Sequence, residues 1–257
     1  MRNEKEELLK VIDGLNKEDI AKLLAMARAT PVLQNLQMPR DVAVAWGRFQ
    51  LWTNAHQMIA KIISMVSVRG LIVIGSANKR GDWRNPFPVE VRVEMAKLAT
   101  SGISNIEIVT ADDLTEENDL SDAWAYFVLG EINKAVGKIP SIMVYGDERG
   151  RDVWFENVPI PGMWQLKVPK SDMVVDVNGR IEEISATVAR KAMVFDDQRT
   201  WQNCTPEQIH QMYPKLRKML LEVPEYKKVH ELMLAVGRDK WDEVYDEYAK
   251  TMAQAPK

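Results

Sequence analysis

The stretch VAVAWGRFQLWTNAHQMIAKIISMV, residues 42–66, joins a short apolar run to a helical pattern through a segment that contains glycine, arginine and histidine. Its first five residues are typical of a buried strand, and QMIAKIISMV, residues 57–66, has the apolar spacing of a helix. In open α/β sheets, ligands bind beyond the carboxyl ends of the strands, where helix amino termini offer N–H groups to phosphate. Residues 47–56 therefore occupy a position where a phosphate site is expected.

Three residues of this segment suit a phosphate. Gly47 would let the backbone approach a ligand, Arg48 offers a cationic fork, and His56 lies in the first turn of the predicted helix. Position alone leaves a second interpretation open, in which Arg48 is an ordinary surface charge and His56 an ordinary residue at a helix start.

The alternation continues through the middle of the chain. Short β-branched runs and helical patterns follow in turn: GLIVIGSA (70–77), EVRVEMAKLATSG (90–102), IEIVTA (106–111), DAWAYFVLGEINKAV (122–136) and SIMVYG (141–146). Strands that alternate with helices of ten or more residues are joined by right-handed crossovers, which give a parallel sheet with helices on both faces. The sequence therefore predicts the α/β class and a doubly wound, Rossmann-like parallel sheet.

Helical patterns without strands flank this region. Apolar residues recur at three- and four-residue spacing between Lys5 and Ala29. Near the other end, Thr205-Pro206 is typical of a helix start, and Pro224 and Gly237 divide the tail into about three helices. The predicted parts are a helical amino-terminal extension (1–40), an α/β domain (41–203) and a helical carboxyl-terminal extension (204–257).

The extensions need partners for their apolar faces. An amphipathic helix buries its apolar stripe either against the α/β domain or against a second subunit. The sequence leaves open which of these holds, so a homo-oligomer is one of two outcomes.

Composition narrows the class of protein. The chain has 257 residues, of which 46% are hydrophobic and 28% charged, and a net charge of -3. This charge gives no basic field for nucleic acid, and no apolar run approaches the roughly 18 residues of a membrane span. Cys204 is the only cysteine, so an intramolecular disulfide and a cysteine-rich metal site are both excluded. The first ten residues lack the apolar core of a signal peptide. We expect a cytoplasmic protein that binds neither nucleic acid nor membrane.

The segment after the first strand resembles the T/H-x-G-H signature of the nucleotidylyltransferase superfamily. It is most similar to the G-R-F-Q-P-F-H-x-G-H motif of the nicotinamide-nucleotide adenylyltransferase branch. Thr53 stands at the T/H position, and the other matches are Gly47, Arg48, Phe49, Gln50 and His56. The departures are Leu51 for proline, Trp52 for phenylalanine and Ala55 for the second glycine. Because that glycine lets the backbone lie close to the nucleotide, the methyl group of Ala55 is expected to weaken or shift nucleotide binding.

Two later segments resemble the same family in the same order. The second strand and its loop are similar to I-V-I-G-S-A followed by N-P-F-x-x-x-x-R, through Gly75, Ser76, Ala77, Asn85, Pro86, Phe87 and Arg92. The motif S-x-T-x-x-R is matched by Ser185, Thr187 and Arg190. Three motifs in order are far more specific than any one of them, and the resemblance spans roughly residues 42–203.

The resemblance implies adenylyl transfer from ATP to nicotinamide mononucleotide, which gives NAD and pyrophosphate. It implies catalytic roles for His56, Thr53 and Arg190, with Arg190 neutralising the leaving pyrophosphate. The implied ATP and phosphate contacts are Gly47, Arg48, Phe49, Ser185 and Thr187. The implied substrate contacts are Gly75, Ser76, Asn85, Arg92 and Trp124. A Mg²⁺ ion is expected to bridge the phosphates while keeping much of its water, so no protein ligand to the metal is predicted.

The acceptor is the least specified part of this prediction. Trp124 either stacks on a pyridinium ring or belongs to the buried face of a helix, and the acidic run 112–122 is either a solvated loop or a filter for acceptor charge. Related enzymes of this fold transfer cytidylyl groups, or adenylyl groups to pantetheine phosphate or flavin mononucleotide. A further alternative is a nucleotide-binding or interaction protein that keeps the fold without turnover.

Overall fold

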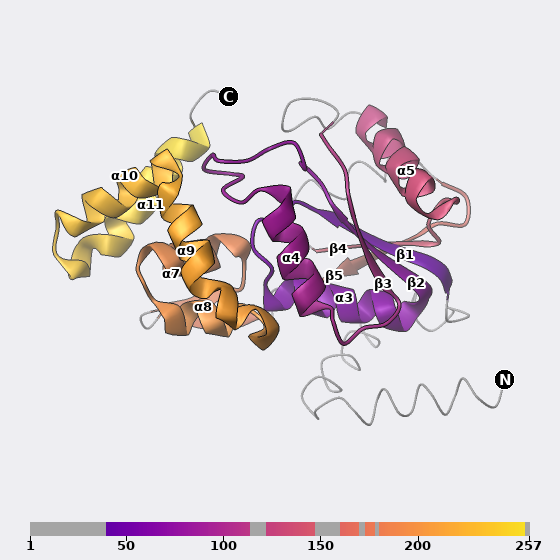
Figure 1. Ribbon diagram of the computed structural model, residues 1–257, viewed down its shortest axis with the longest axis horizontal. Coiled ribbons are helices and arrows are strands. Elements are labelled where there is room, and N and C mark those ends of the chain that lie inside the picture. The colour runs from indigo at the N-terminus through magenta and orange to yellow at the C-terminus, as the bar shows by residue number, and fades with distance from the viewer. Residues whose placement is uncertain (1–39, 114–121, 147–159, 170–172, 178–179, 255–257) are drawn as a thin grey trace. The chain divides into compact units, whose positions relative to one another are not determined.

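The computed structural model describes residues 40–113, 122–146, 160–169, 173–177 and 180–254 (Figure 1). The chain divides into two compact units, Met1–Met38 and Pro39–Lys257, and all described residues belong to the second. The helices predicted before residue 40 lie outside the described residues, as does most of the acidic run before Trp124. The predicted boundaries of the three parts of the chain remain predictions.

The centre of the second unit is a five-stranded parallel sheet with the order β3-β2-β1-β4-β5. The chain moves outward from β1 to β2 and β3, and then returns to place β4 on the other side of β1. Ligands of such sheets bind at the carboxyl ends of the strands where the order reverses. Gly47, the last residue of β1, lies at this reversal. The strands are β1 (Arg40–Gly47), β2 (Ser67–Ile74), β3 (Ile106–Thr110), β4 (Ile142–Gly146) and β5 (Trp164–Val168).

Both faces of the sheet are covered, so the central strands are apolar throughout. Val44 of β1 and Val73 of β2 pack in one core cluster with α5 (Asp122–Val136). The residues next to Val44 and Val73 in these strands have their side chains on the opposite face of the sheet. The helices α3 (Asn54–Val66) and α4 (Val89–Ala99) cover that face (Figure 1). The continuous apolar runs of β1 and β2 are what a doubly covered parallel sheet requires. The doubly wound architecture predicted from the sequence is confirmed.

The strands β5, β6 (Val174–Val177) and β7 (Arg180–Glu183) were not predicted. β5 is an edge strand of the main sheet, and β6 and β7 form a separate antiparallel pair. Each has only four or five residues and includes charged side chains, so none stands out as an apolar run.

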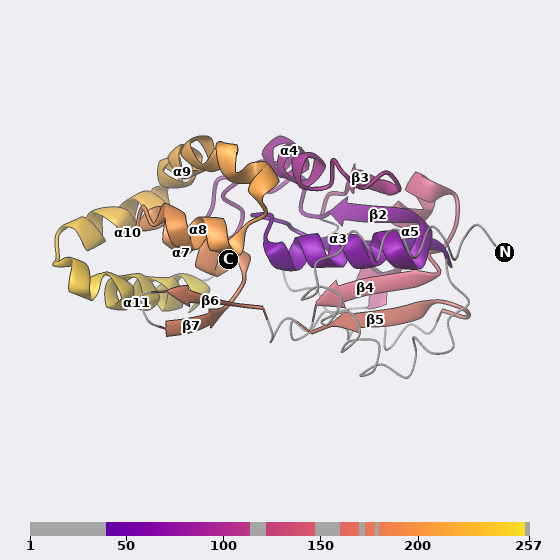
Figure 2. The same ribbon diagram turned by 90° about the horizontal axis from the view of Figure 1, so that it is seen from below.

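Helices make up the rest of the described chain. They are α7 (Ala186–Val194), α8 (Gln198–Cys204), the 3-10 helix η2 (Glu207–Met212), α9 (Tyr213–Glu222), α10 (Pro224–Leu234), the 3-10 helix η3 (Arg238–Lys240) and α11 (Trp241–Gln254). Figure 2 shows α9, α10 and α11 beyond one end of the sheet. This is the end where β1 finishes and α3 begins. Among the described helices, none combines the length and apolarity of a membrane span.

The helix predicted to start at Thr205-Pro206 starts instead at Tyr213. Thr205 ends α8, since its hydroxyl donates to the carbonyl oxygen of Trp201 at 2.8 Å. A 3-10 segment comes next, and Pro214 in the first turn of α9 marks the true helix start. The prediction at Pro224 is confirmed, because this residue begins α10.

Gly70 sets how closely α3 and β3 pack against β2. A Cβ atom built on Gly70 would lie 2.5 Å from Cγ2 of Ile63 in α3 and 2.4 Å from Cδ1 of Ile106 in β3. Ile63 is fully buried, so its methyl group has no free space to move into. Because Gly70 has no side chain, α3 and β3 can pack closely against β2.

We predict that Gly70→Ala lowers the free energy of unfolding by about 1–3 kcal/mol, because the added methyl overpacks the core. Urea denaturation followed by tryptophan fluorescence measures the change. The control is Gly130→Ala in α5, where no atom lies within 4 Å of the added Cβ. This control should be neutral or slightly stabilising, and an equal loss in both variants would contradict the packing role of Gly70.

Candidate nucleotide-binding site

The first motif turns sharply after β1. Phe49 has a left-handed backbone conformation with φ of 47°, which is uncommon for a residue with a side chain. Its ring stacks on Trp52 with centroids 5.2 Å apart and meets the His56 ring edge-on at 4.9 Å. Because Phe49 and Trp52 are buried, these contacts fix the path of the chain from β1 into α3. A direct contact between Phe49 and ATP remains a prediction.

Thr53 and His56 form a reciprocal cap at the start of α3. The Thr53 hydroxyl accepts from the backbone N–H of His56 at 3.5 Å, and the Thr53 N–H donates to His56 Nδ1 at 3.1 Å. Histidine here takes the place that Glu or Gln has in the usual capping box. Because Nδ1 accepts a hydrogen bond, the proton of the neutral ring lies on Nε2. His56 is therefore an N–H donor at the amino end of a helix, which suits a phosphate oxygen.

The remaining first-motif residues line the same turn. Gly47 is buried, and its carbonyl oxygen accepts from the Gly75 N–H at 2.9 Å, while Arg48 is half-buried. Ala55, which replaces the glycine of the family motif, is 2% exposed within the first turn of α3. Its expected effect on nucleotide binding remains a prediction. Thr53 is 1% exposed and holds His56 through the cap, and its catalytic role remains a prediction.

The end of β2 approaches the end of β1 closely. A Cβ atom on Gly75 would lie 2.7 Å from Nε1 of Trp46, the residue before Gly47, so the absence of a side chain at Gly75 leaves room for the Trp46 ring. Ser76 follows with a left-handed backbone at φ of 50°, and its hydroxyl donates to Asp113 at 2.9 Å. Two neighbouring strands thus each end in a residue with an uncommon backbone conformation, and such residues cluster at ligand sites.

Arg92 of α4 clamps these two strand ends together. Its Nη1 donates to the carbonyl oxygens of Arg48 at 2.8 Å and Gly75 at 2.7 Å, and its Nη2 donates to that of Ser76 at 2.8 Å. The residue is 0% exposed. Burial lowers the pKa of Arg92 to about 10, which still leaves it charged at neutral pH. The structure encloses the Arg92 guanidinium among backbone carbonyls, and the substrate contact that the motif implies for Arg92 remains a prediction.

Gln50 joins the first motif to the loop after β2. Its Nε2 donates to Asn85 Oδ1 at 3.2 Å, and its Oε1 accepts from the Phe87 N–H at 3.1 Å. Asp82 caps the loop from within, since its Oδ1 accepts from the N–H groups of Arg84 and Asn85 at 2.8 and 2.7 Å. Asn85 is 1% exposed and helps to shape the loop, and the substrate contact that the motif implies for it remains a prediction.

The third motif forms the amino end of α7. Ser185 is its N-cap, and the Ser185 hydroxyl accepts from the Val188 N–H at 3.2 Å. One turn on, Nη2 of Arg190 donates to the Thr187 hydroxyl at 3.3 Å, and Nε donates to the hydroxyl of Tyr226 in α10 at 2.8 Å. The first turn of a helix has N–H groups without partners in the helix, so this end of α7 is a second position suited to phosphate.

Hydrogen bonds connect the three motifs. The Asn54 side chain, at the start of α3, donates to the carbonyl oxygen of Asn203 at the end of α8, and Figure 2 shows these elements side by side. The Tyr226 hydroxyl donates to the carbonyl oxygen of Trp83 in the loop after β2 at 3.0 Å. The helix starts of α3 and α7 and the loop after β2 therefore belong to one connected site at the carboxyl ends of β1 and β2.

Trp124 lies near this site but within the core. It is 6% exposed and meets Trp46 edge-on at 5.9 Å, and Trp46 directly precedes Gly47. This position fits the alternative in which Trp124 belongs to the buried face of a helix. A stacking contact with a substrate ring would require the indole to be uncovered when the substrate binds, and it remains a prediction.

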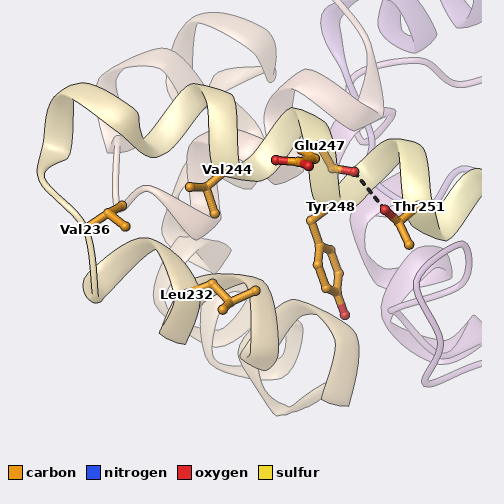
Figure 3. Close-up of a pocket in the computed structure, with 6 residues that line it drawn as sticks. All are labelled: Leu232, Val236, Val244, Glu247, Tyr248 and Thr251. Atoms are coloured by element: carbon orange, nitrogen blue, oxygen red, sulfur yellow. Dashed lines mark hydrogen bonds between the residues drawn. The ribbon is translucent and has the colours of Figure 1, made fainter.

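The groove in Figure 3 lies away from the motifs. It is lined by Leu232 of α10, by Val236 just after this helix, and by Val244, Glu247, Tyr248 and Thr251 of α11. None of the motif residues contributes to it, so it is not the candidate site. Within the described ranges, no group of three or more His, Cys, Asp or Glu side chains could hold a metal ion.

Sequence reasoning missed Tyr226 and Trp83. Tyr226 lies 143 residues from Trp83 and 36 from Arg190, and no pattern in the sequence connects them. The amphipathic spacing of the tail indicates that Tyr226 is buried. This spacing does not indicate which polar group its hydroxyl contacts.

We predict that Arg92→Met lowers the free energy of unfolding by about 3 kcal/mol or more, because three buried carbonyl oxygens lose a charged donor. The control is Arg69→Met, which breaks an exposed ion pair with Glu107 of 2.6 Å and should change stability little. Urea denaturation of both variants measures the difference. A small loss for Arg92→Met, equal to that of the control, would show that the strand ends hold their conformation without the clamp.

Comparison with known proteins supports the same fold. Two structures of a bifunctional NMN adenylyltransferase/ADP ribose pyrophosphatase from Francisella tularensis are similar, one free (TM-score 0.56) and one complexed with AMP and a manganese ion (TM-score 0.54). Each is 19% identical over 77% of this chain, which spans 57% and 56% of their lengths. At this identity the likeness shows the fold alone. No curated protein sequence matches the chain.

The sequence itself identifies the family. Residues 44–192 match the cytidylyltransferase-like family, and this range contains all three motifs whose geometry is described above. The match covers more than half of the 257 residues. The chain therefore belongs to the cytidylyltransferase-like family and has the Rossmann-like fold of its nucleotidyltransferases.

Proposed function

We propose that this protein transfers the adenylyl group of ATP to nicotinamide mononucleotide, with NAD and pyrophosphate as products. The observation that carries the proposal is the pair of capped helix starts, α3 with His56 and α7 with Arg190, connected at the reversal point of the sheet. Two such positions suit a triphosphate, whose α-phosphate is transferred with the adenylyl group while its β- and γ-phosphates leave as pyrophosphate.

The reaction needs no covalent intermediate. A phosphate oxygen of the acceptor attacks the α-phosphorus of ATP, the bond from this phosphorus to the oxygen that bridges to the β-phosphorus breaks, and pyrophosphate leaves with that electron pair. Catalysis then consists of alignment and of neutralising charge on phosphate oxygens. We assign the donor at His56 Nε2 to the α-phosphate and the start of α7, with Ser185, Thr187 and Arg190, to the β- and γ-phosphates. Arg48 would anchor the triphosphate, and Gly47 would leave room for it.

A divalent metal fits this arrangement. Mg²⁺ commonly binds nucleotide phosphates and water with few protein ligands, and the described residues contain no cluster that would hold it by themselves. When bound, the ion would reduce the negative charge of the triphosphate. The similar Francisella tularensis structure, which contains AMP and manganese, supports a divalent ion together with the nucleotide.

The choice of acceptor rests on the motifs. Gly47 to Gln50 and the segment from Gly75 to Phe87 are most similar to the nicotinamide-nucleotide branch, and the neighbouring structures are named as NMN adenylyltransferases. In the proposal, Gly75 and Ser76 border the acceptor, while Asn85 and Arg92 hold the backbone around it.

The function is tested by pyrophosphate release from the purified chain. ATP, CTP and GTP with Mg²⁺ are each paired with nicotinamide mononucleotide, nicotinic acid mononucleotide, pantetheine phosphate and flavin mononucleotide. The proposal expects release with ATP and nicotinamide mononucleotide. Release only with CTP, or only with another acceptor, would change the assigned substrates. If the folded protein releases no pyrophosphate with any pair, the alternative of a nucleotide-binding protein without turnover would replace the proposal.

We predict that His56→Asn lowers kcat by about 10²–10³, the usual cost of losing one donor to a transition state. Asparagine keeps an acceptor near the Nδ1 position, so the cap with Thr53 survives while the Nε2–H donor is lost. His56→Gln is the matched variant, because its amide nitrogen reaches toward the Nε2 position, and it should retain more activity. Equal rates for wild type and His56→Asn would remove His56 from the mechanism.

A further inference from the structure

Tyr226 of α10 lies between two parts of the proposed ATP site. It is 0% exposed, and its ring stacks on Trp83 with centroids 4.2 Å apart and an interplanar angle of 18°. Its hydroxyl accepts from Nε of Arg190 at 2.8 Å and donates to the carbonyl oxygen of Trp83 at 3.0 Å. One buried hydroxyl from the carboxyl-terminal helices therefore joins the third motif to the loop after β2.

The hydroxyl can make both hydrogen bonds only while it keeps its proton. Burial raises the pKa of Tyr226, against the opposing effect of the Arg190 charge, so the group is neutral at neutral pH. A neutral phenol has one donor and acceptor lone pairs, and here Trp83 and Arg190 use them.

These contacts fix the Arg190 guanidinium. Nε binds Tyr226 and Nη2 binds Thr187, and among the described residues no partner is present for Nη1. Arg190 is 9% exposed. A planar guanidinium held at two of its three nitrogens is oriented before a ligand arrives, and pre-orientation lowers the entropic cost of binding phosphate.

A second contact holds the tail helices against the same face of α7. Lys191 next to Arg190 makes ion pairs with Asp242 at 2.7 Å and Asp246 at 2.8 Å, both from α11. Burial disfavours the charge of Lys191, but the hydrogen bonds that its ammonium donates to the two carboxylates outweigh this effect, so the pKa of Lys191 is raised. These ion pairs hold α11 against α7, and α10 packs against α11.

We infer that Tyr226 is a positioning residue of the nucleotide site: its hydroxyl orients Arg190 toward the triphosphate and ties it to the loop that carries Trp83. The inference rests on the proposed function in that Arg190 is taken to bind phosphate. It gives the carboxyl-terminal helices a part in ATP binding.

Binding of α,β-methylene-ATP with Mg²⁺ to the full chain, measured by isothermal titration calorimetry, tests this inference without turnover. Tyr226→Phe keeps the stacked ring and removes the hydroxyl, and it should weaken binding about tenfold. Tyr245→Phe is the matched control: Tyr245 is 2% exposed, belongs to the same aromatic cluster, and its hydroxyl has no hydrogen-bond partner in the described structure. The control should bind like wild type, and equal binding by all three proteins would overturn the inference.

A double variant separates positioning from general damage. In an Arg190→Lys background, Tyr226→Phe should cause little further loss, because lysine has no Nε–H to orient. Equal losses in both backgrounds would assign the effect to packing and overturn the inference. In all these variants the affinity for nicotinamide mononucleotide should stay unchanged.

The wild-type chain provides a measurement that does not depend on any variant at Tyr226 folding. The ¹⁵N–¹H signal of Arg190 Nε, assigned by its loss in Arg190→Lys, should exchange slowly with solvent, and fast exchange would contradict the hydrogen bond. Failure of the proposed function looks different, since wild type would bind the ATP analogue yet release no pyrophosphate with any acceptor. Absence of analogue binding by folded wild type would overturn the inference as well.

Discussion

The candidate site depends on a fully buried cation, Arg92, whose hydrogen bonds in the described part of the chain all go to backbone oxygens. Arg92 donates to the carbonyl groups of Arg48, Gly75 and Ser76, where the two central strands end. Phe49 and Ser76 beside these carbonyls have left-handed backbones, which cost energy unless the surroundings fix them. Without Arg92, the carbonyl oxygens of these two tight turns would lose a charged donor within the protein, which is costly. The shape of the candidate phosphate site therefore depends on Arg92 of α4.

A series of hydrogen bonds connects the strand ends around Arg92 to the carboxyl-terminal helices. Gln50 holds the loop after β2 through Asn85, the loop presents Trp83, and the Tyr226 hydroxyl joins Trp83 to Arg190. Most of these groups are buried, where hydrogen bonds are strong and unpaired polar atoms are costly. Such a network favours a single arrangement of the three motifs, which is what alignment of a triphosphate with an acceptor phosphate requires.

Much of this structure was predictable from sequence because local patterns determine it. The apolar runs at 42–46 and 70–74 form β1 and β2, and residues 57–66 lie within α3, as their periodicity predicts. The chemistry of the motifs indicated His56 and Arg190, and the structure places His56 in the first turn of α3 and Arg190 one turn into α7, while their contacts with phosphate remain predictions. The part of Arg92 was not predictable, since a motif arginine next to a phosphate site suggests a ligand contact, and only the fold shows that backbone carbonyls surround it. Tyr226 was not predictable for a similar reason, because its partners are set by how the tail packs.

The central claim is that the starts of α3 and α7 bind one triphosphate between them. A crystal structure of the chain with α,β-methylene-ATP, Mg²⁺ and nicotinamide mononucleotide tests it most directly. We expect an α-phosphate oxygen within hydrogen-bond distance of His56 Nε2, the β- and γ-phosphates at the amino end of α7 beside Arg190, and the Arg92 contacts unchanged. A nucleotide bound elsewhere, or phosphates that contact neither helix start, would contradict the account.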